Sequence, residues 1–353
     1  MIPTLTHTKI QRQNMTLMSF GFVLGLVVLT SLSFGAFSIP FPQTLAILFD
    51  QMGLSFGSYE LQQSNVLLQI RLPRVLMAIV VGGGLGISGA ALQGMFRNPL
   101  VEPGLIGVSS GSALFAVLFM VLIPTATATF SWVKLLGLPF FAFVGGLTCV
   151  TAVYQLSKSQ GKIDAATLIL AGVAINALAG SLIGLVLFFA DDSALRSFTF
   201  WSLGDLGGAT WAKIPLTFLL IVIPSILLLF NARQLNTLAL GEQEAFHMGV
   251  NVQQVKIRLL ISCALIVGVG VSMVGMIGFV GLVVPHLIRI LFGADHRLVL
   301  PGSFLLGAIL LNFADLVARL IVIPAEMPIG VITALIGAPF FIWLIFNLNK
   351  SRN

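Results

Sequence analysis

Charged residues are scarce in this sequence. Only 8% of its 353 residues are Asp, Glu, Lys or Arg, 58% are hydrophobic, and the mean hydropathy is +1.06. Because an average soluble domain is about 25% charged, this composition excludes an ordinary soluble protein and indicates a polytopic membrane protein. The 18 Lys and Arg residues stand singly between apolar runs and form no basic stripe, so we predict no nucleic-acid binding.

Cysteine and the common catalytic motifs are scarce as well. Cys149 and Cys263 both lie in apolar runs, so the sequence predicts no disulfide framework. There is no GxxxxGK[ST] loop to cradle nucleotide phosphates, and no HExxH, CxxC or GxSxG motif. We therefore predict that the chain is not an enzyme and binds no metal or cofactor of its own. Energy for any transport that it performs has to come from another chain.

Long hydrophobic runs dominate what is present. A helix needs about 20 apolar residues to cross a bilayer. Ten candidate spans lie near 16–37, 66–92, 104–124, 135–156, 167–190, 213–231, 257–277, 279–292, 300–323 and 328–347. The run over 257–292 can be one span or two, because Gly275, Gly278, Gly281 and Pro285 interrupt it.

Positive charge favours two spans in that run. Lys and Arg are enriched in cytoplasmic loops. With ten spans and the N-terminus inside, twelve Lys and Arg residues lie on the cytoplasmic side and six outside, whereas nine spans give nine on each side. We therefore predict an all-α integral membrane protein with ten transmembrane helices. One membrane domain, 16–347, lies between cytoplasmic tails at 1–15 and 348–353.

The most polar interruption within the membrane domain is the segment 237–258, TLALGEQEAFHMGVNVQQVKIR, which we call the elbow. Glu242 and Glu244 suit the first turn of a short helix, where carboxylates complement exposed N–H groups. Gly249 can end that helix in a left-handed conformation, and Asn251 is a good N-cap for the next one. Two short helices joined by a bend suit docking to another protein, although a plain connecting loop explains the pattern equally well.

Three arginines are predicted to lie on the outer side of the membrane. Arg71 and Arg74 stand in QIRLPRVL, where the second span begins, and Arg319 ends on the same side. Guanidinium groups bind carboxylates in bidentate fashion, so the three arginines could meet a partner protein. The alternative is that Arg71 and Arg74 snorkel to the membrane interface. Arg319 follows Asp315 by four residues, which favours an ion pair within one helix.

Glycine spacing and the outer loops complete the pattern. Gly82, Gly86 and Ala90 recur every four residues, and ordinary close packing of helices explains such spacing best. The segment 191–213, DDSALRSFTFWSLGDLGGATWAK, is typical of a short interfacial helix anchored by its tryptophans.

Four stretches together resemble the FecCD family of ABC-importer permeases. They are RLPRVLMAIVVGGGLGISGAALQGMFRNPLVEPGLIGVSSG, GEQEAFHMGV, GMIGFVGLVVPHLIRILFGADHRLVLPGS and EMPIGVITALIGAPFFIWLI. The resemblance extends over nearly the whole chain from Arg71 to Leu344. It implies the type II importer architecture, in which two ten-helix permeases form a homodimer in the bacterial inner membrane. A separate pair of ABC ATPase subunits, which use ATP and Mg²⁺, docks on the cytoplasmic side, and a periplasmic binding protein delivers the substrate from outside.

The resemblance also implies roles for single residues. GEQEAFHMGV matches the coupling helices, which places Glu242, Glu244, Ala245 and Gly249 at the ATPase contact. Arg71, Arg74 and Arg319 match arginines that meet carboxylates of the binding protein.

A third set of positions matches a cytoplasmic gate. In the cobalamin member of the family, hydroxyl residues after the fourth span form that gate. Here Asp164, Ala165 and Ala166 stand at those positions, so the hydroxyl chemistry is missing.

Two stretches, FTFWSLGDLGGATW and FRNPLVEPGLIGVSSGSALFAVLF, resemble the haem-importer branch most. We therefore expect haem as the transported substrate, with ferric siderophores or cobalamin as alternatives. A different class, a stand-alone secondary transporter, would need essential carboxylates at mid-membrane.

Overall fold

The computed structural model describes residues 3–54, 57–123, 130, 132–159 and 162–350. The described chain is helical apart from one two-stranded antiparallel hairpin. The predicted tails at 1–15 and 348–353 lie partly outside these ranges. Within them, α1 begins at Pro3, so the predicted N-terminal tail is mostly an extension of the first membrane helix.

The elements follow one another as a series of long helices with short polar connections. In chain order they are α1 (Pro3–Ser33), α2 (Phe41–Asp50), α3 (Leu61–Asn65), the π-helical turn η1 (Val66–Arg71), α4 (Leu72–Phe96), the 3-10 turn η2 (Pro103–Ile106), α5 (Val108–Leu122), the π-helical turn η4 (Val133–Gly137), α6 (Leu138–Leu156), β1 (Lys158–Ser159), β2 (Lys162–Ile163), α7 (Ala165–Phe188), α8 (Asp192–Ser202), α9 (Ile214–Phe230), α10 (Ala232–Leu238), α11 (Glu242–His247), α12 (Val252–Val274), α13 (Val280–Phe292), α14 (His296–Ile321) and α15 (Ile329–Lys350).

Apolar helices occur in each of the ten predicted spans. Among the described residues, six helices are long and apolar enough to cross a membrane, and the pair α9 and α10, bent by 54°, makes a seventh if it counts as one span. The shorter apolar helices α5, α13 and the first part of α15 occupy the other three ranges. Several membrane-spanning helices are therefore present, while the full count of ten stays a prediction.

The ambiguous run over 257–292 forms two helices. α12 ends at Val274, and Gly275 leaves the helix at a φ of +76°. Phe279 also has a positive φ, +68°, and α13 starts directly after it. A left-handed residue breaks the i to i−4 hydrogen-bond ladder, so the chain changes direction here.

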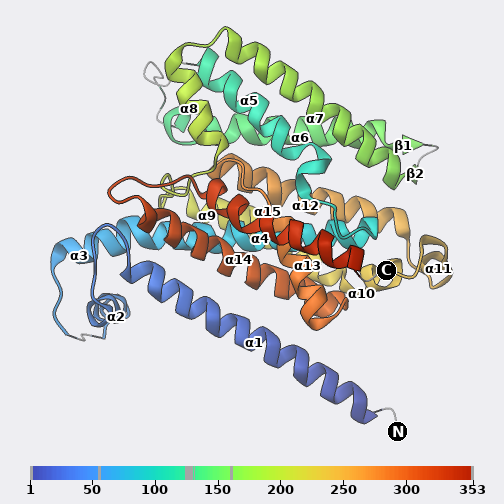
Figure 1. Cartoon of the computed structure of the whole chain (residues 1–353), viewed down its shortest axis with the longest axis horizontal. Coiled ribbons are helices and arrows are strands. Elements are labelled where there is room, and N and C mark those ends of the chain that lie inside the picture. Colours follow the sequence, from blue (N-terminus) through green and yellow to red (C-terminus); the bar gives the residue numbers. More distant parts are fainter. Residues whose placement is uncertain (1–2, 55–56, 124–129, 131, 160–161, 351–353) are drawn as a thin grey trace.

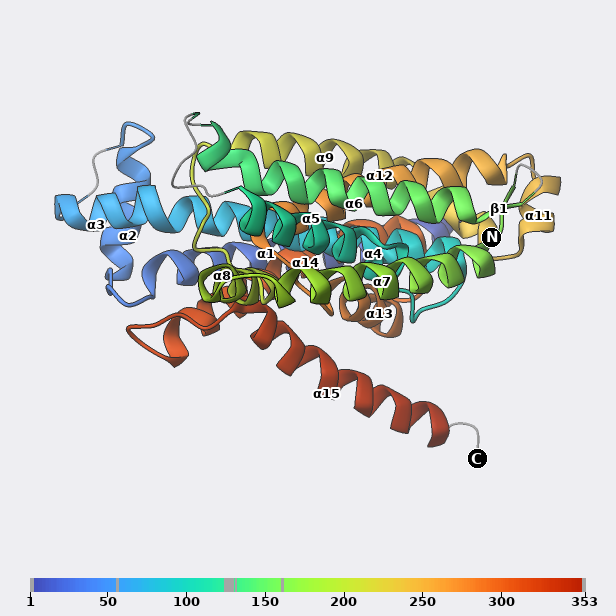
Figure 2. The same ribbon diagram turned by 90° about the horizontal axis from the view of Figure 1, so that it is seen from above.

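The helices lie side by side along the long axis of the molecule (Figure 1). The start of α1, the hairpin β1–β2, α11 and the end of α15 gather at one end, which we call the elbow end. At the opposite end lie α2, α3 and α8 (Figures 1 and 2). Helices α5, α6 and α7 form a layer on one side of α4, and α1 lies on the other side.

Helix α4 is the centre of the bundle, and its glycines allow that position. A Cβ on Gly86 would lie 2.1 Å from the backbone oxygen of Ser303 in α14, and one on Gly89 would lie 1.8 Å from the oxygen of Gly281 in α13. Lipid offers helices no hydrophobic drive to associate, so close backbone contact through small residues supplies the attraction. The close-packing interpretation of Gly86 is confirmed.

This contact predicts that two matched glycine substitutions have different effects on the free energy of unfolding. Gly86→Ala forces a methyl group against the backbone of α14 and should cost about 1–3 kcal/mol of stability, because neither backbone can move aside. Gly25→Ala in α1 places its Cβ where no atom lies within 4 Å, so it should be neutral or slightly stabilising. Thermal unfolding in detergent measures both, and equal unfolding temperatures would contradict the packing argument.

Candidate functional site at the two ends of the bundle

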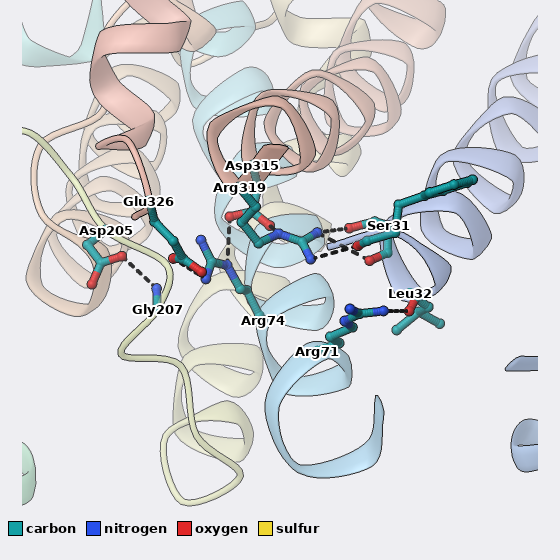
Figure 3. Close-up of polar contacts among 10 residues, drawn as sticks. Ser31, Leu32, Arg71, Arg74, Asp205, Gly207, Asp315, Arg319 and Glu326 are labelled. Atoms are coloured by element: carbon teal, nitrogen blue, oxygen red, sulfur yellow. Dashed lines mark hydrogen bonds and ion pairs between the residues drawn. The ribbon is translucent and has the colours of Figure 1, made fainter. Parts of the chain in front are cut away.

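The three predicted outer arginines converge at the end opposite the elbow (Figure 3). Arg74 Nε lies 2.7 Å from Asp315 Oδ1, and its Nη1 lies 2.7 Å from Glu326 Oε2. Arg319 Nε lies 3.0 Å from Asp315 Oδ2, which forms the ion pair within one helix that the sequence favoured. The single carboxylate of Asp315 thus pairs with two arginines at once.

Asp315 is completely buried, and Glu326 is half exposed. A buried carboxylate without a countercharge is very costly, and the two arginines supply that countercharge to Asp315 in its apolar surroundings. Glu326 lies on the connection between α14 and α15 and binds Arg74 (Figure 3). Because Glu326 is half exposed, it is the member of this cluster that reaches solvent.

Arg71 and Arg319 also cap the C-terminal end of α1 by donating hydrogen bonds to its last carbonyl oxygens. Arg71 Nη1 donates to the carbonyl oxygens of Leu32 at 2.6 Å and Ser33 at 2.9 Å, and its Nη2 donates to that of Phe37. Arg319 Nη2 donates to the backbone oxygen of Ser31 at 3.2 Å and to its Oγ at 2.6 Å. The last carbonyls of a helix lack partners within the helix, and cations are favoured there.

The location of these arginines was predicted, but their burial was not. Arg71, Arg74 and Arg319 are 4%, 6% and 6% exposed. Their guanidinium groups point inward to α1, Asp315 and Glu326 (Figure 3). In this structure they hold together the end of the bundle opposite the elbow.

The elbow contains one of the two predicted short helices, α11, whereas the second is the beginning of the 23-residue helix α12. Glu242 and Glu244 lie in the first turn of α11, and Gly249 ends the turn with a φ of +81°. The side chain of Asn251 caps α12 by accepting a hydrogen bond from the Gln254 amide at 3.1 Å. Three of the four proposed contact residues, Glu242, Glu244 and Gly249, reach the surface, whereas Ala245 is buried and packs the elbow itself.

Sequence reasoning missed the apolar surface of the elbow. Leu240, Phe246 and Met248 are 66%, 70% and 64% exposed although they are large and hydrophobic. Phe246 lines a groove of about 930 Å³ together with Glu242, His247 and other elbow residues. Exposed apolar side chains rimmed by polar ones mark protein–protein interaction sites. The sequence signal for this surface was the presence of Phe246 and Met248 beside the charged and polar residues of GEQEAFHMGV.

The predicted gate residues lie at the start of α7, near the elbow. Asp164 is the N-cap, and its Oδ2 accepts from the Thr167 amide at 2.8 Å and the Thr167 hydroxyl at 2.6 Å. Ala165 and Ala166 follow in the first turn, with Ala166 exposed. The next residue, Thr167, carries a hydroxyl, and this hydroxyl is bound to Asp164. The hairpin β1–β2 directly before Asp164 was not predicted.

After the end of α4, residues 97–107 form a connection without α-helix that folds back along α4 and contains the 3-10 turn η2. Gln93 Nε2 in α4 donates to the carbonyl oxygens of Val101 at 3.3 Å and Leu282 at 3.2 Å. Asn176 Nδ2 in α7 donates to that of Gly104 at 3.2 Å. Irregular backbone inside a membrane is tolerated only where protein or water satisfies it, and these amides do so.

This fold-back segment carries an acid that sequence reasoning overlooked. The half-buried carboxylate of Glu102 accepts a hydrogen bond from the Phe279 amide at 3.3 Å, at the start of α13. Among the described residues, no group of three His, Cys, Asp or Glu side chains could hold a metal ion.

Removal of the shared carboxylate should be far more damaging than removal of its exposed neighbour. Asp315→Asn leaves two buried arginines without their main countercharge, and we expect a loss of about 3–5 kcal/mol. Glu326→Gln removes a half-exposed partner and should cost at most about 1 kcal/mol. Thermal unfolding of both variants in detergent measures the difference, and an equal loss would show that Asp315 does not anchor the cluster.

Comparison with known proteins gives a consistent result. The FecCD transport family model matches residues 23–347. The chain is 49% identical to the hemin transport system permease protein HmuU of Yersinia pestis, over 82% of this chain and 85% of that protein. It is 36% identical to the vitamin B12 import system permease protein BtuC of Vibrio cholerae, over 87% of this chain and 91% of that one.

A solved structure supports the same assignment. It is described as an inward-facing conformation of a metal-chelate type ABC transporter and is 35% identical, with a TM-score of 0.80. The similarity covers 94% of this chain and 98% of the other. The chain therefore belongs to the FecCD transport family and is a permease of the ABC-importer type.

Proposed function

We propose that the chain is the permease through which haem passes from a periplasmic binding protein to the cytoplasm. The observation that carries this proposal is the 49% identity to a hemin permease, against 41% for a cobalamin import permease and 35% for an iron-uptake permease. Ferric siderophores and cobalamin are the alternative cargoes, because relatives named for iron and vitamin B12 transport also match.

The energy for transport comes from an ABC ATPase pair that docks on the elbow. The exposed side chains of Leu240, Phe246 and Met248 and the groove along α11 support this placement, since large exposed apolar side chains beside polar ones mark protein–protein interaction sites. ATP binding and hydrolysis in the partner move α11, and the helices rock between outward-open and inward-open arrangements. The elbow end is then cytoplasmic, as are both termini.

A second copy of the chain completes the pathway. Helix α7 is largely exposed in the single chain, and Ala177, Gly180, Ser181 and Gly184 form a small-residue stripe on its surface. No atom lies within 4 Å of a Cβ position on Gly180 or Gly184. Small residues let membrane helices approach closely, so this stripe supports a homodimer.

The binding protein docks at the opposite end, where Arg71, Arg74 and Arg319 converge. Each guanidinium already has acceptors within the chain. Carboxylates of the partner would therefore replace intrachain acceptors, and Glu326 on Arg74 is the most accessible of these because its side chain is 48% exposed.

A stand-alone secondary transporter is the rival function. Asp315 does not suit a proton-coupling role because it is completely buried and both of its oxygens are bound to arginines. Glu102, which lies against the start of α13, is the acid that such a transporter would use. Uptake by the chain without any ATPase, abolished by Glu102→Gln, would favour the rival.

The deciding experiment places the chain, its ATPase and its binding protein in proteoliposomes. ATP hydrolysis is measured with the binding protein loaded with haem, a ferric siderophore or cobalamin. We expect haem to stimulate hydrolysis roughly fivefold or more over the other cargoes, the lower end of typical coupling between sites. Equal stimulation by all three would overturn haem as the cargo, and haem uptake without ATPase would overturn the ATP-driven mechanism.

A further inference from the structure

A buried lysine connects the elbow to the start of α7. Lys256 lies in the second turn of α12 and is only 3% exposed. Its Nζ lies 2.7 Å from Glu242 Oε1 in α11 and donates to the carbonyl oxygen of Ile163 in β2 at 3.1 Å. One ammonium group thus contacts the coupling segment and the hairpin at the same time.

A second side chain on α12 strengthens the link. Gln253, three residues before Lys256 and so on the same helical face, accepts a hydrogen bond from the Ile163 amide at 2.9 Å. Both backbone polar groups of Ile163 are therefore held by α12. The Ile163 side chain is itself buried, which fixes the strand further.

Ile163 directly precedes the N-cap of α7. The Asp164 amide donates to the Ser157 carbonyl at 3.3 Å, which joins the hairpin to the end of α6. The two hydrogen bonds from Thr167 lower the pKa of Asp164 below its ordinary value, and the nearby Lys256 cation lowers it further. The hairpin, the N-cap and Lys256 thus act electrostatically and geometrically as one unit.

The burial of Lys256 requires an explanation. A lysine is almost never fully buried unless it is paired, because removing its charge from water is costly. A hydrophobic residue of similar size would fill the space without that cost. Glu242, its ion-pair partner, is 41% exposed and lines the groove of the elbow. A protein that docks in the groove can therefore alter the ion pair directly.

We propose that Lys256 is a positioning residue that transmits movement of the elbow to the cytoplasmic end of α7. This inference rests on the proposed docking of an ATPase at the elbow. When the ATPase moves α11, Glu242 moves with it. Lys256 and Gln253 then carry the displacement to Ile163 and the N-cap of α7, the helix that bears the small-residue stripe.

The test compares Lys256→Met with Arg12→Met in the reconstituted complex. Arg12 is exposed on α1, outside the elbow, so it is a matched loss of one positive charge. Cargo transported per ATP hydrolysed is measured with haem, or with whichever of the three cargoes stimulates the wild-type complex. Hydrogen exchange of residues 163–167 with and without nucleotide is the second readout.

We expect Lys256→Met to co-purify with the ATPase and hydrolyse ATP, while cargo moved per ATP falls about tenfold, equivalent to 1.4 kcal/mol of coupling. Nucleotide should no longer change hydrogen exchange at 163–167. Lys256→Arg, which keeps the charge and the donors, should recover part of the ratio, and Arg12→Met should match the wild type.

An unchanged ratio in Lys256→Met, or an equal fall in Arg12→Met, overturns the inference. If Lys256→Met does not fold, Gln253→Leu takes its place, because it breaks the contact with the Ile163 amide and leaves the ammonium in position. The same loss is expected, and an unchanged ratio again overturns the inference. A wild-type chain that binds no ATPase at all would instead contradict the proposed function.

Discussion

Every backbone polar group that leaves a helix inside a membrane needs a partner from within the protein. This constraint explains the unusual burial of polar side chains here. Arg71 and Arg319 satisfy the final carbonyls of α1, Gln93 satisfies the fold-back segment after α4, and Lys256 with Gln253 satisfies Ile163. The long side chains work as internal caps wherever the helical ladder ends.

The same constraint relates the fold to transport. Polar caps concentrate at the two ends of the bundle, and these ends are where an importer must meet a binding protein on one side and an ATPase on the other. Close glycine contacts hold α4 rigidly against α13 and α14 between them. Movement is then more easily accommodated by α7 and the elbow, which are joined to the centre through hydrogen bonds and have fewer tightly packed contacts.

Local features were predictable from the sequence, and distant partnerships were not. The left-handed Gly249 and the Asn251 cap follow from short-range backbone preferences, and the two helices within 257–292 were predicted from the distribution of positive charge. The inward orientation of Arg71 does not, because its acceptors are carbonyl oxygens in α1, and a carbonyl looks the same at every residue. Lys256 was counted only as one cytoplasmic charge, since nothing in its neighbours indicates the hairpin that it contacts.

The central claim is that the elbow is where ATP-driven work enters the chain. Phe246→Asp tests it most directly, because this side chain is 70% exposed and its replacement leaves the core intact. Haem uptake into proteoliposomes that contain the ATPase and the binding protein is the measurement. The account predicts a folded chain that no longer retains the ATPase and no longer takes up haem. Wild-type uptake by Phe246→Asp would contradict it.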